Sequence, residues 1–174
     1  LGHGGDAPAT RDERAAYLLS EEEKSRGTAL LKLAALILYT FPGSPMLYYG
    51  DEAGMQGFED PFNRGTYPWD RENPELVRYF RQLGALRKAH EALQRGTIDY
   101  CAAQGRVLAF RRASNSEKCI TAVNAGEQSA VLTLPWDAPL AQDALTRQSF
   151  FCCDGLLRLT LEPYGAALLV EPEK

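Results

Sequence analysis

The segment Pro45–Tyr49 most constrains how this chain can fold. It is apolar at nearly every position and directly follows a helical pattern, which is typical of a parallel strand covered on both faces. One such strand cannot form a sheet alone, because its backbone groups need partners along both edges. The first half of the chain therefore predicts a single strand of an α/β architecture rather than a whole sheet.

Two helical patterns flank this strand. The segment Ser20-Glu21-Glu22-Glu23 has the form of a capping box, so a helix is expected to begin directly after the serine. Pro42-Gly43 ends it, and apolar residues on more than one face predict that it is buried on most sides. The second helix has Asn73 as its cap and Pro74 in its first position, and it is expected to end near Arg95-Gly96.

The sequence after residue 96 is nearly all strand. Its short alternating segments are typical of an antiparallel β-sandwich. The predicted strands are Ile98–Ala102, Arg106–Arg112, Cys119–Asn124, Ala130–Leu134, Ser149–Cys153, Leu156–Leu161 and Ala166–Val170. Asp154-Gly155 is the strongest hairpin signal, because a type I′ turn needs positive φ at both central residues. We expect two domains, an α/β region over residues 1–95 and an all-β region over residues 96–174.

Charge and hydropathy exclude two classes of partner. The 174 residues carry a formal net charge of −4 without a cluster of Lys and Arg, which argues against nucleic acid. The longest apolar run, Ala29–Phe41, is interrupted by Lys32. It is too short to cross a bilayer, which takes roughly 20 residues, so no membrane partner is expected.

The cysteines and histidines do not suggest a metal site. The four cysteines are Cys101, Cys119, Cys152 and Cys153, and none has C-x-x-C spacing. The two histidines, His3 and His90, lie far from all of them in sequence. We therefore expect reduced, mostly buried thiols, no disulfide, no metal and no cofactor. Unpaired cysteines also favour a cytoplasmic location.

Chemistry is expected in the long loop after the predicted strand. Asp51 and Glu52 come just past its carboxyl end, where α/β architectures carry their active sites. They could instead cap the strand end and pair with a neighbour. A retaining glycosidase needs two carboxyl groups about 5–5.5 Å apart, and adjacent residues of a strand point to opposite faces. A catalytic partner for either acid must therefore come from elsewhere. Motifs for serine hydrolases, P-loop enzymes, zinc proteases and dinucleotide binding are absent from the sequence.

The segment Phe41–Met55, FPGSPMLYYGDEAGM, resembles the α-amylase family, glycoside hydrolase family 13. The segments DPFNR at 60–64 and YPWD at 67–70 are similar to its cyclomaltodextrinase, neopullulanase and maltogenic amylase branch. The resemblance implies that Met46–Tyr49 is the eighth strand of a TIM (β/α)8 barrel, between the helices Glu21–Phe41 and Pro74–Gln94. It also implies that the residues from about 96 form the carboxyl-terminal β-sandwich of such an enzyme.

The same resemblance implies a function and a set of site residues. The family cleaves α-glucosidic bonds with retention, using acidic residues that follow the fourth, fifth and seventh barrel strands, and none of these corresponds to part of this chain. No catalytic residue is therefore expected here. Asp60 and Arg64 have the spacing of a sugar-binding pair, although the alternative is a salt bridge within the loop. Asp51 and Glu52 would brace the site. Trp69 could stack on a sugar, but its position before Asp70 and a helix favours a packing role.

Two hypotheses follow from these observations. In the first, the chain is the carboxyl-terminal portion of a hydrolase acting on maltooligosaccharides or cyclodextrins, and it is inactive by itself. An apolar patch left by the incomplete barrel would then favour self-association. In the second, the chain is a stand-alone carbohydrate-binding or interaction module.

Overall fold

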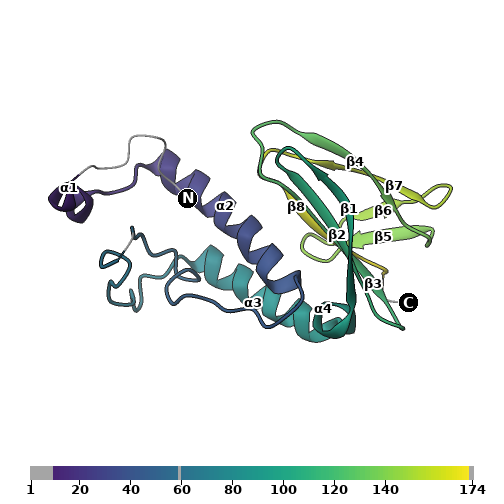
Figure 1. The fold of residues 1–174 in the computed structure, drawn as a ribbon, viewed down its shortest axis with the longest axis horizontal. Coiled ribbons are helices and arrows are strands. Elements are labelled where there is room, and N and C mark those ends of the chain that lie inside the picture. The colour runs from purple at the N-terminus through teal and green to yellow at the C-terminus, as the bar shows by residue number, and fades with distance from the viewer. Residues whose placement is uncertain (1–9, 59, 173–174) are drawn as a thin grey trace. The chain divides into compact units, whose positions relative to one another are not determined.

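The computed structural model describes residues 10–58 and 60–172, so His3 lies outside the described residues. The helices are α1 (Arg11–Ala16), α2 (Glu21–Thr40), α3 (Pro74–Ala89) and α4 (Glu91–Arg95). The strands are β1 (Thr97–Gln104), β2 (Val107–Ala113), β3 (Lys118–Asn124), β4 (Ala130–Pro135), β5 (Leu140–Asp143), β6 (Ser149–Phe151), β7 (Leu156–Leu161) and β8 (Ala166–Val170). Helices give way to strands directly after α4 (Figure 1).

The chain forms two compact units that each combine separate segments. Unit 1 consists of Leu1–Lys32 and Met46–Arg81, and unit 2 of Leu33–Pro45 and Gln82–Lys174. Both α2 and α3 therefore contribute residues to both units. In the part of the chain that the structure describes, no helix is long and apolar enough to cross a membrane.

The caps of the two long helices confirm their predicted starts. At α2 the Ser20 hydroxyl accepts a hydrogen bond from the Glu23 amide (3.2 Å), and the Glu23 carboxylate accepts one from the Ser20 amide (2.8 Å). At α3 the Asn73 side-chain oxygen accepts from the amides of Glu75 (3.0 Å) and Leu76 (3.3 Å). Local sequence is sufficient to set these ends.

The end of the second helix differs from the prediction. Instead of one helix to Gln94, α3 ends at Ala89 and a short α4 follows, with His90 between them in an extended conformation (φ −107°, ψ 112°). The break frees the Ala92 amide to donate to the Glu117 carboxylate (2.9 Å). The sequence pattern would continue the helix, but this hydrogen bond to a residue 25 positions away along the chain stabilises the break.

Two predictions for the first half are not confirmed in the structure. Residues 46–49 are not a strand, because no segment among the described residues pairs with them. The helix α2 is not buried on most sides: its buried residues are Leu33, Ala35, Leu36 and Thr40, while Leu31 and Leu38 are partly exposed.

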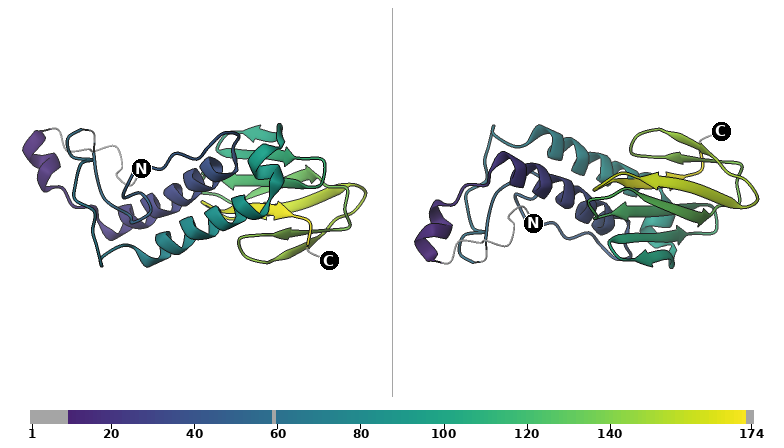
Figure 2. Two further views of the ribbon diagram at one scale, coloured as in Figure 1. Left: turned by 90° about the horizontal axis from the view of Figure 1, so that it is seen from below. Right: turned by 90° about the horizontal axis from the view of Figure 1, so that it is seen from above.

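The strands form two antiparallel sheets, as the alternating pattern predicted (Figures 1 and 2). The six-stranded sheet has the order β1-β2-β3-β8-β5-β6, and β4 pairs with β7 in a two-stranded sheet. One core cluster joins side chains from both sheets: Ala109, Ile120, Ala122, Leu134, Trp136, Ala141, Leu157, Leu159, Leu161, Ala167 and Leu169. Strand β3 is buried at every position but its first, so it is covered on both faces.

The sequence pattern missed the short strand β5. Its last residue, Asp143, is a charged group at 3% exposure, which a binary pattern assigns to the surface. One carboxylate oxygen accepts from the amides of Leu145 (3.1 Å) and Leu168 (3.0 Å), and the other accepts from the Thr146 hydroxyl (2.6 Å). These three bonds compensate the loss of water around a buried acid.

One buried cation, Arg112 on β2, joins three elements of unit 2. It is 1% exposed. Its Nη1 donates to the carbonyls of Thr40 (2.6 Å) and Leu93 (3.2 Å), its Nη2 to Gly96 (2.8 Å), and its Nε to Thr97 (3.0 Å). The helix α2 has no basic residue in its own last turn. The guanidinium therefore supplies the positive charge that the carbonyl end of this helix favours.

Replacing Arg112 should cost far more stability than replacing its neighbour. We expect Arg112→Met to lower the free energy of unfolding by about 3 kcal/mol, because it leaves buried carbonyls without donors. Arg111→Met is the matched control: Arg111 lies on the same strand and pairs with Asp99 (3.1 Å), in a partly exposed bridge worth below about 1 kcal/mol. Urea denaturation measures both values, and equal losses in the two variants would contradict the role given to Arg112.

Candidate functional site

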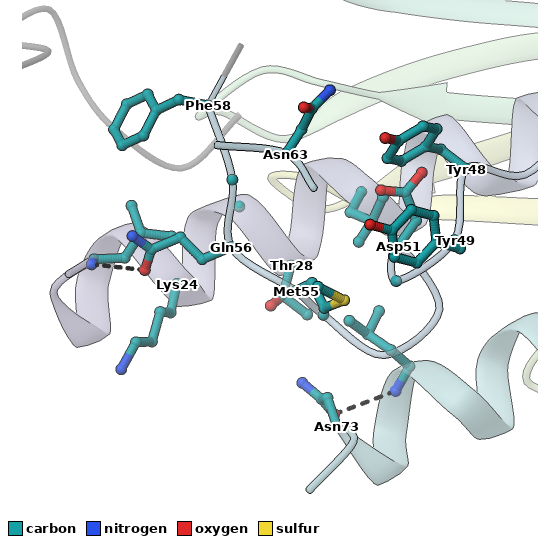
Figure 3. A pocket seen from close by; sticks show the side chains of 17 residues that line it. Lys24, Thr28, Tyr48, Tyr49, Asp51, Met55, Gln56, Phe58, Asn63 and Asn73 are labelled. Carbon is teal, nitrogen blue, oxygen red and sulfur yellow. Dashed lines mark hydrogen bonds between the residues drawn. The ribbon is translucent and has the colours of Figure 1, made fainter. Parts of the chain in front are cut away.

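A hollow of about 520 Å³ lies in unit 1, between the first half of α2 and the segment that follows residue 47 (Figure 3). Its lining mixes aromatic, apolar and polar side chains. The lining residues are Leu19, Lys24, Gly27, Thr28, Leu31, Tyr48, Tyr49, Gly50, Asp51, Gly54, Met55, Gln56, Gly57, Phe58, Asn63, Asn73 and Leu76. Figure 3 shows Tyr48, Tyr49 and Asp51 together at one end of it.

A tight turn at Gly50 places these residues. The Gly50 carbonyl accepts hydrogen bonds from the amides of Ala53 (3.1 Å) and Met55 (2.9 Å), which brings the chain back on itself. Gly50 has φ +94°, and a Cβ there would collide with the Met55 sulfur. A glycine is therefore required by both conformation and space. The rings of Tyr48 and Tyr49 lie 5.1 Å apart just before the turn.

Asp51 and Glu52 have different surroundings in this turn. Glu52 Oε2 accepts from the Gly50 amide (3.0 Å), so this acid braces the turn. Asp51 lines the hollow. The pKa of its carboxyl is raised above the ordinary value, mainly by burial and to a smaller extent by the nearby charge of Glu52. The two acids lie within a turn rather than at the end of a strand, so the alternation of side chains along a strand does not apply to them.

Side-chain hydrogen bonds fix the opposite wall of the hollow. Gln56 Oε1 accepts from the Leu19 amide (3.0 Å), and its Nε2 donates to the Tyr17 carbonyl (2.5 Å). The rings of Tyr17 and Phe58 meet edge to face with their centroids 5.7 Å apart. The loop after residue 50 is thus tied to the segment between α1 and α2.

Asp60 and Arg64 contact each other, with Asp60 Oδ1 2.5 Å from Arg64 Nε. Both side chains are well exposed, and neither lines the hollow. The ion pair is the loop-internal alternative considered for these residues, and their contact with a sugar stays a prediction. Trp69 is 75% exposed, with its ring centroid 4.6 Å from that of Tyr67, so it is less packed than a structural role would require.

The structure also brings together a cluster that the sequence did not indicate. His90, Glu117 and Cys119 have ligating atoms that all lie within 4.8 Å of one another, in unit 2. Sequence distance had set His90 apart from the cysteines. The available signal was the spacing of Glu117 and Cys119, two residues apart beside a strand and hence on one face. The expectation of mostly buried thiols was also too broad: Cys119 is buried, Cys101 and Cys152 are partly exposed, and Cys153 is exposed.

Comparisons with known proteins identify relatives of this chain, and the family model that matches covers most of the strands. The family model described as "Maltogenic Amylase, C-terminal domain" matches residues 102–168. The cyclomaltodextrinase of Geobacillus thermopakistaniensis is 37% identical over 144 residues, covering 79% of this chain and 24% of that protein. Neopullulanase 2 of Thermoactinomyces vulgaris is 32% identical over 148 residues, covering 81% of this chain and 25% of that protein.

A solved structure shares the same fold. The α-amylase of Geobacillus thermoleovorans, determined with acarbose, matches with a TM-score of 0.77 and 26% identity, over 84% of this chain and 34% of that one. The chain is similar to glycoside hydrolases of the α-amylase family. Among them it is similar to a cyclomaltodextrinase and a neopullulanase, and it spans about a quarter of the length of these two curated relatives.

The raised pKa of Asp51 predicts a pH-dependent cost to stability. The folded state holds this proton to higher pH than the unfolded state does, so stability falls as pH rises through the folded pKa. We expect Asp51→Asn to increase the free energy of unfolding at pH 7, by less than about 1 kcal/mol because the group is partly exposed. The gain should fade below about pH 4, where Asp51 is protonated in both states.

Urea denaturation of Asp51→Asn across this pH range measures the effect. Glu52→Gln is the companion variant: removing the Glu52 charge should lower the pKa of Asp51 in a carboxyl NMR titration. A destabilised Asp51→Asn at pH 7 would show that its carboxylate makes a favourable interaction instead.

Proposed function

We propose that this chain is the carboxyl-terminal portion of a retaining α-glucan hydrolase acting on maltooligosaccharides or cyclodextrins. The observation that carries the proposal is the 37% identity to a cyclomaltodextrinase over 79% of the chain. The likeness to an α-amylase solved with acarbose supports the same substrate class. The cysteines are free, which supports a cytoplasmic location for the enzyme.

In the complete enzyme, residues 46–49 would form the eighth barrel strand of a domain ending near residue 95. The segment is poised for this role, because Met46 is 85% exposed and Tyr48 and Tyr49 are about half exposed. Large apolar side chains left in water favour association. We propose that the isolated chain self-associates through them.

Asp60 and Arg64 would bind sugar hydroxyls in the complete enzyme. Their ion pair uses the Nε–H of the guanidinium, which has five N–H donors, and the Asp60 carboxylate has further acceptor sites. Charge-assisted hydrogen bonds of this kind are stronger than neutral ones. Glu52 would brace the loop that carries the pair, and Asp51 would face the hollow.

The chain alone should not hydrolyse α-glucans. A retaining glycosidase needs a nucleophile and an acid/base, and in this proposal both reside in the part of the enzyme that precedes this chain. A reducing-sugar assay with maltotriose and cyclodextrins should therefore give no turnover above that of a heat-treated sample. Turnover that co-purifies with the chain and is lost in Asp51→Asn would place a catalytic acid within it.

A stand-alone sugar-binding module is the second candidate, favoured by the exposed Asp60–Arg64 pair and the exposed Trp69. Calorimetry with maltotriose separates the two functions. The fragment hypothesis predicts no micromolar binding by the chain, whereas a module would bind and would lose at least tenfold affinity in Arg64→Ala. Arg71→Ala, in the same loop and also exposed, is the matched control.

A further inference from the structure

The cluster of His90, Glu117 and Cys119 lies in unit 2, whereas the residues proposed to bind sugar belong to unit 1. His90 occupies the break between α3 and α4, Glu117 directly precedes β3, and Cys119 is the second residue of β3. His90 Nδ1 and Glu117 Oε2 are 2.9 Å apart, and Cys119 Sγ lies within 4.8 Å of both. The imidazole and carboxylate are partly exposed, while the thiol is fully buried beneath them.

We propose that this chain binds one zinc ion through His90 Nδ1, the Glu117 carboxylate and Cys119 Sγ, with water as the fourth ligand. Imidazole and thiolate are donors that Zn²⁺ prefers and that Ca²⁺ and Mg²⁺ do not. Zinc bonds of about 2.0–2.3 Å place tetrahedral donor atoms roughly 3.3–3.8 Å apart. The distance from the sulfur to the other two donor atoms must therefore shorten by up to roughly 1.3 Å, and the His90–Glu117 contact must open slightly.

A second hydrogen bond orients the carboxylate for this role. Glu117 Oε1 accepts from the Ala92 amide (2.9 Å), which leaves Oε2 directed at His90. Outer bonds of this kind hold metal ligands in place. The break between α3 and α4 allows both contacts of Glu117, because it places the His90 imidazole and the free Ala92 amide beside the carboxylate.

Proton release accompanies binding. Burial raises the pKa of the Cys119 thiol to about 12, so the thiol is protonated before the ion arrives. As the Zn–S bond forms, the S–H bond breaks and its proton leaves to solvent. The N–H bond at His90 Nδ1, which the hydrogen bond to the Glu117 carboxylate requires, must also break, and its proton leaves to solvent or is exchanged through solvent to Nε2, so that the Nδ1 lone pair can bond to the metal. Arg112 lies opposite Cys119 in the β2–β3 register, but its donors are engaged by four carbonyl oxygens.

A single hydrogen bond between His90 and Glu117 is the alternative use of this cluster. It would fix the helix break without any metal, and it gives Cys119 no part. The two uses differ in what happens when Zn²⁺ is added and when the thiol alone is removed.

The test titrates Zn²⁺ into the metal-free 174-residue chain in competition with a chromophoric chelator. We expect one ion per chain, with micromolar or tighter affinity, and a higher unfolding temperature once it is bound. Cys119→Ser and His90→Gln should each weaken binding at least tenfold. Cys153→Ser is the matched control, because it removes an exposed thiol outside the cluster and should leave the affinity unchanged.

Cobalt(II) reports on the sulfur directly. A thiolate-to-cobalt charge-transfer band should form in the wild type and in Cys153→Ser and be lost in Cys119→Ser. Far-UV circular dichroism shows whether each variant is folded, and His90→Gln changes a partly exposed side chain, so the test does not depend on the buried cysteine variant. Absence of stoichiometric zinc binding, or wild-type affinity in a folded Cys119→Ser or His90→Gln, would overturn the proposal.

Discussion

Unit 2 depends on a cation that is buried without a carboxylate. Arg112 is surrounded by backbone carbonyls from the end of α2, from α4 and from the residues that start β1. An arginine cannot lose its proton in a protein, so its charge must be compensated where it lies. The partial negative charges of helix carbonyls provide that compensation. Arg87 extends the arrangement, because it donates to the carbonyls of Tyr39 and Phe41 at the end of the same helix.

This constraint explains why the end of α2 belongs with the strands. Residues 33–45 fall in unit 2, although they precede the first strand by more than 50 residues. The side chain of Phe41 packs edge to face on Phe110 of β2, with centroids 5.7 Å apart, next to the Arg112 contacts. The sequence placed a boundary near residue 95 from the change of pattern alone, and a change of pattern does not report which residues pack together.

The sequence correctly predicted the helix caps and the hairpin turn, because these features are determined by residues close together in the chain. Ser20 and Asn73 cap helices within four residues of themselves, and Asp154-Gly155 has the positive φ values (53° and 75°) that a tight hairpin needs. The burial of Asp143 and the position of His90 were missed for the opposite reason. Each owes its position to a partner at least 25 residues away, the Leu168 amide for one and Glu117 for the other. Hydrophobic periodicity carries no information about such partners.

The acids at the candidate site, Asp51 and Glu52, are positioned by a turn rather than by the predicted strand over residues 46–49. If residues 46–49 form a strand, Asp51 and Glu52 are separated by alternation between its faces. In the structure both acids lie in the turn that begins at Gly50: Glu52 accepts a hydrogen bond from the Gly50 amide, and Asp51 faces the hollow. The family resemblance implied that both acids brace the sugar site. The hydrogen bond of Glu52 to the Gly50 amide supports that role for Glu52, and the role stays a prediction for both acids. Burial and the neighbouring charge of Glu52 raise the pKa of the Asp51 carboxyl, so the two acids differ in their surroundings although they are adjacent in the sequence.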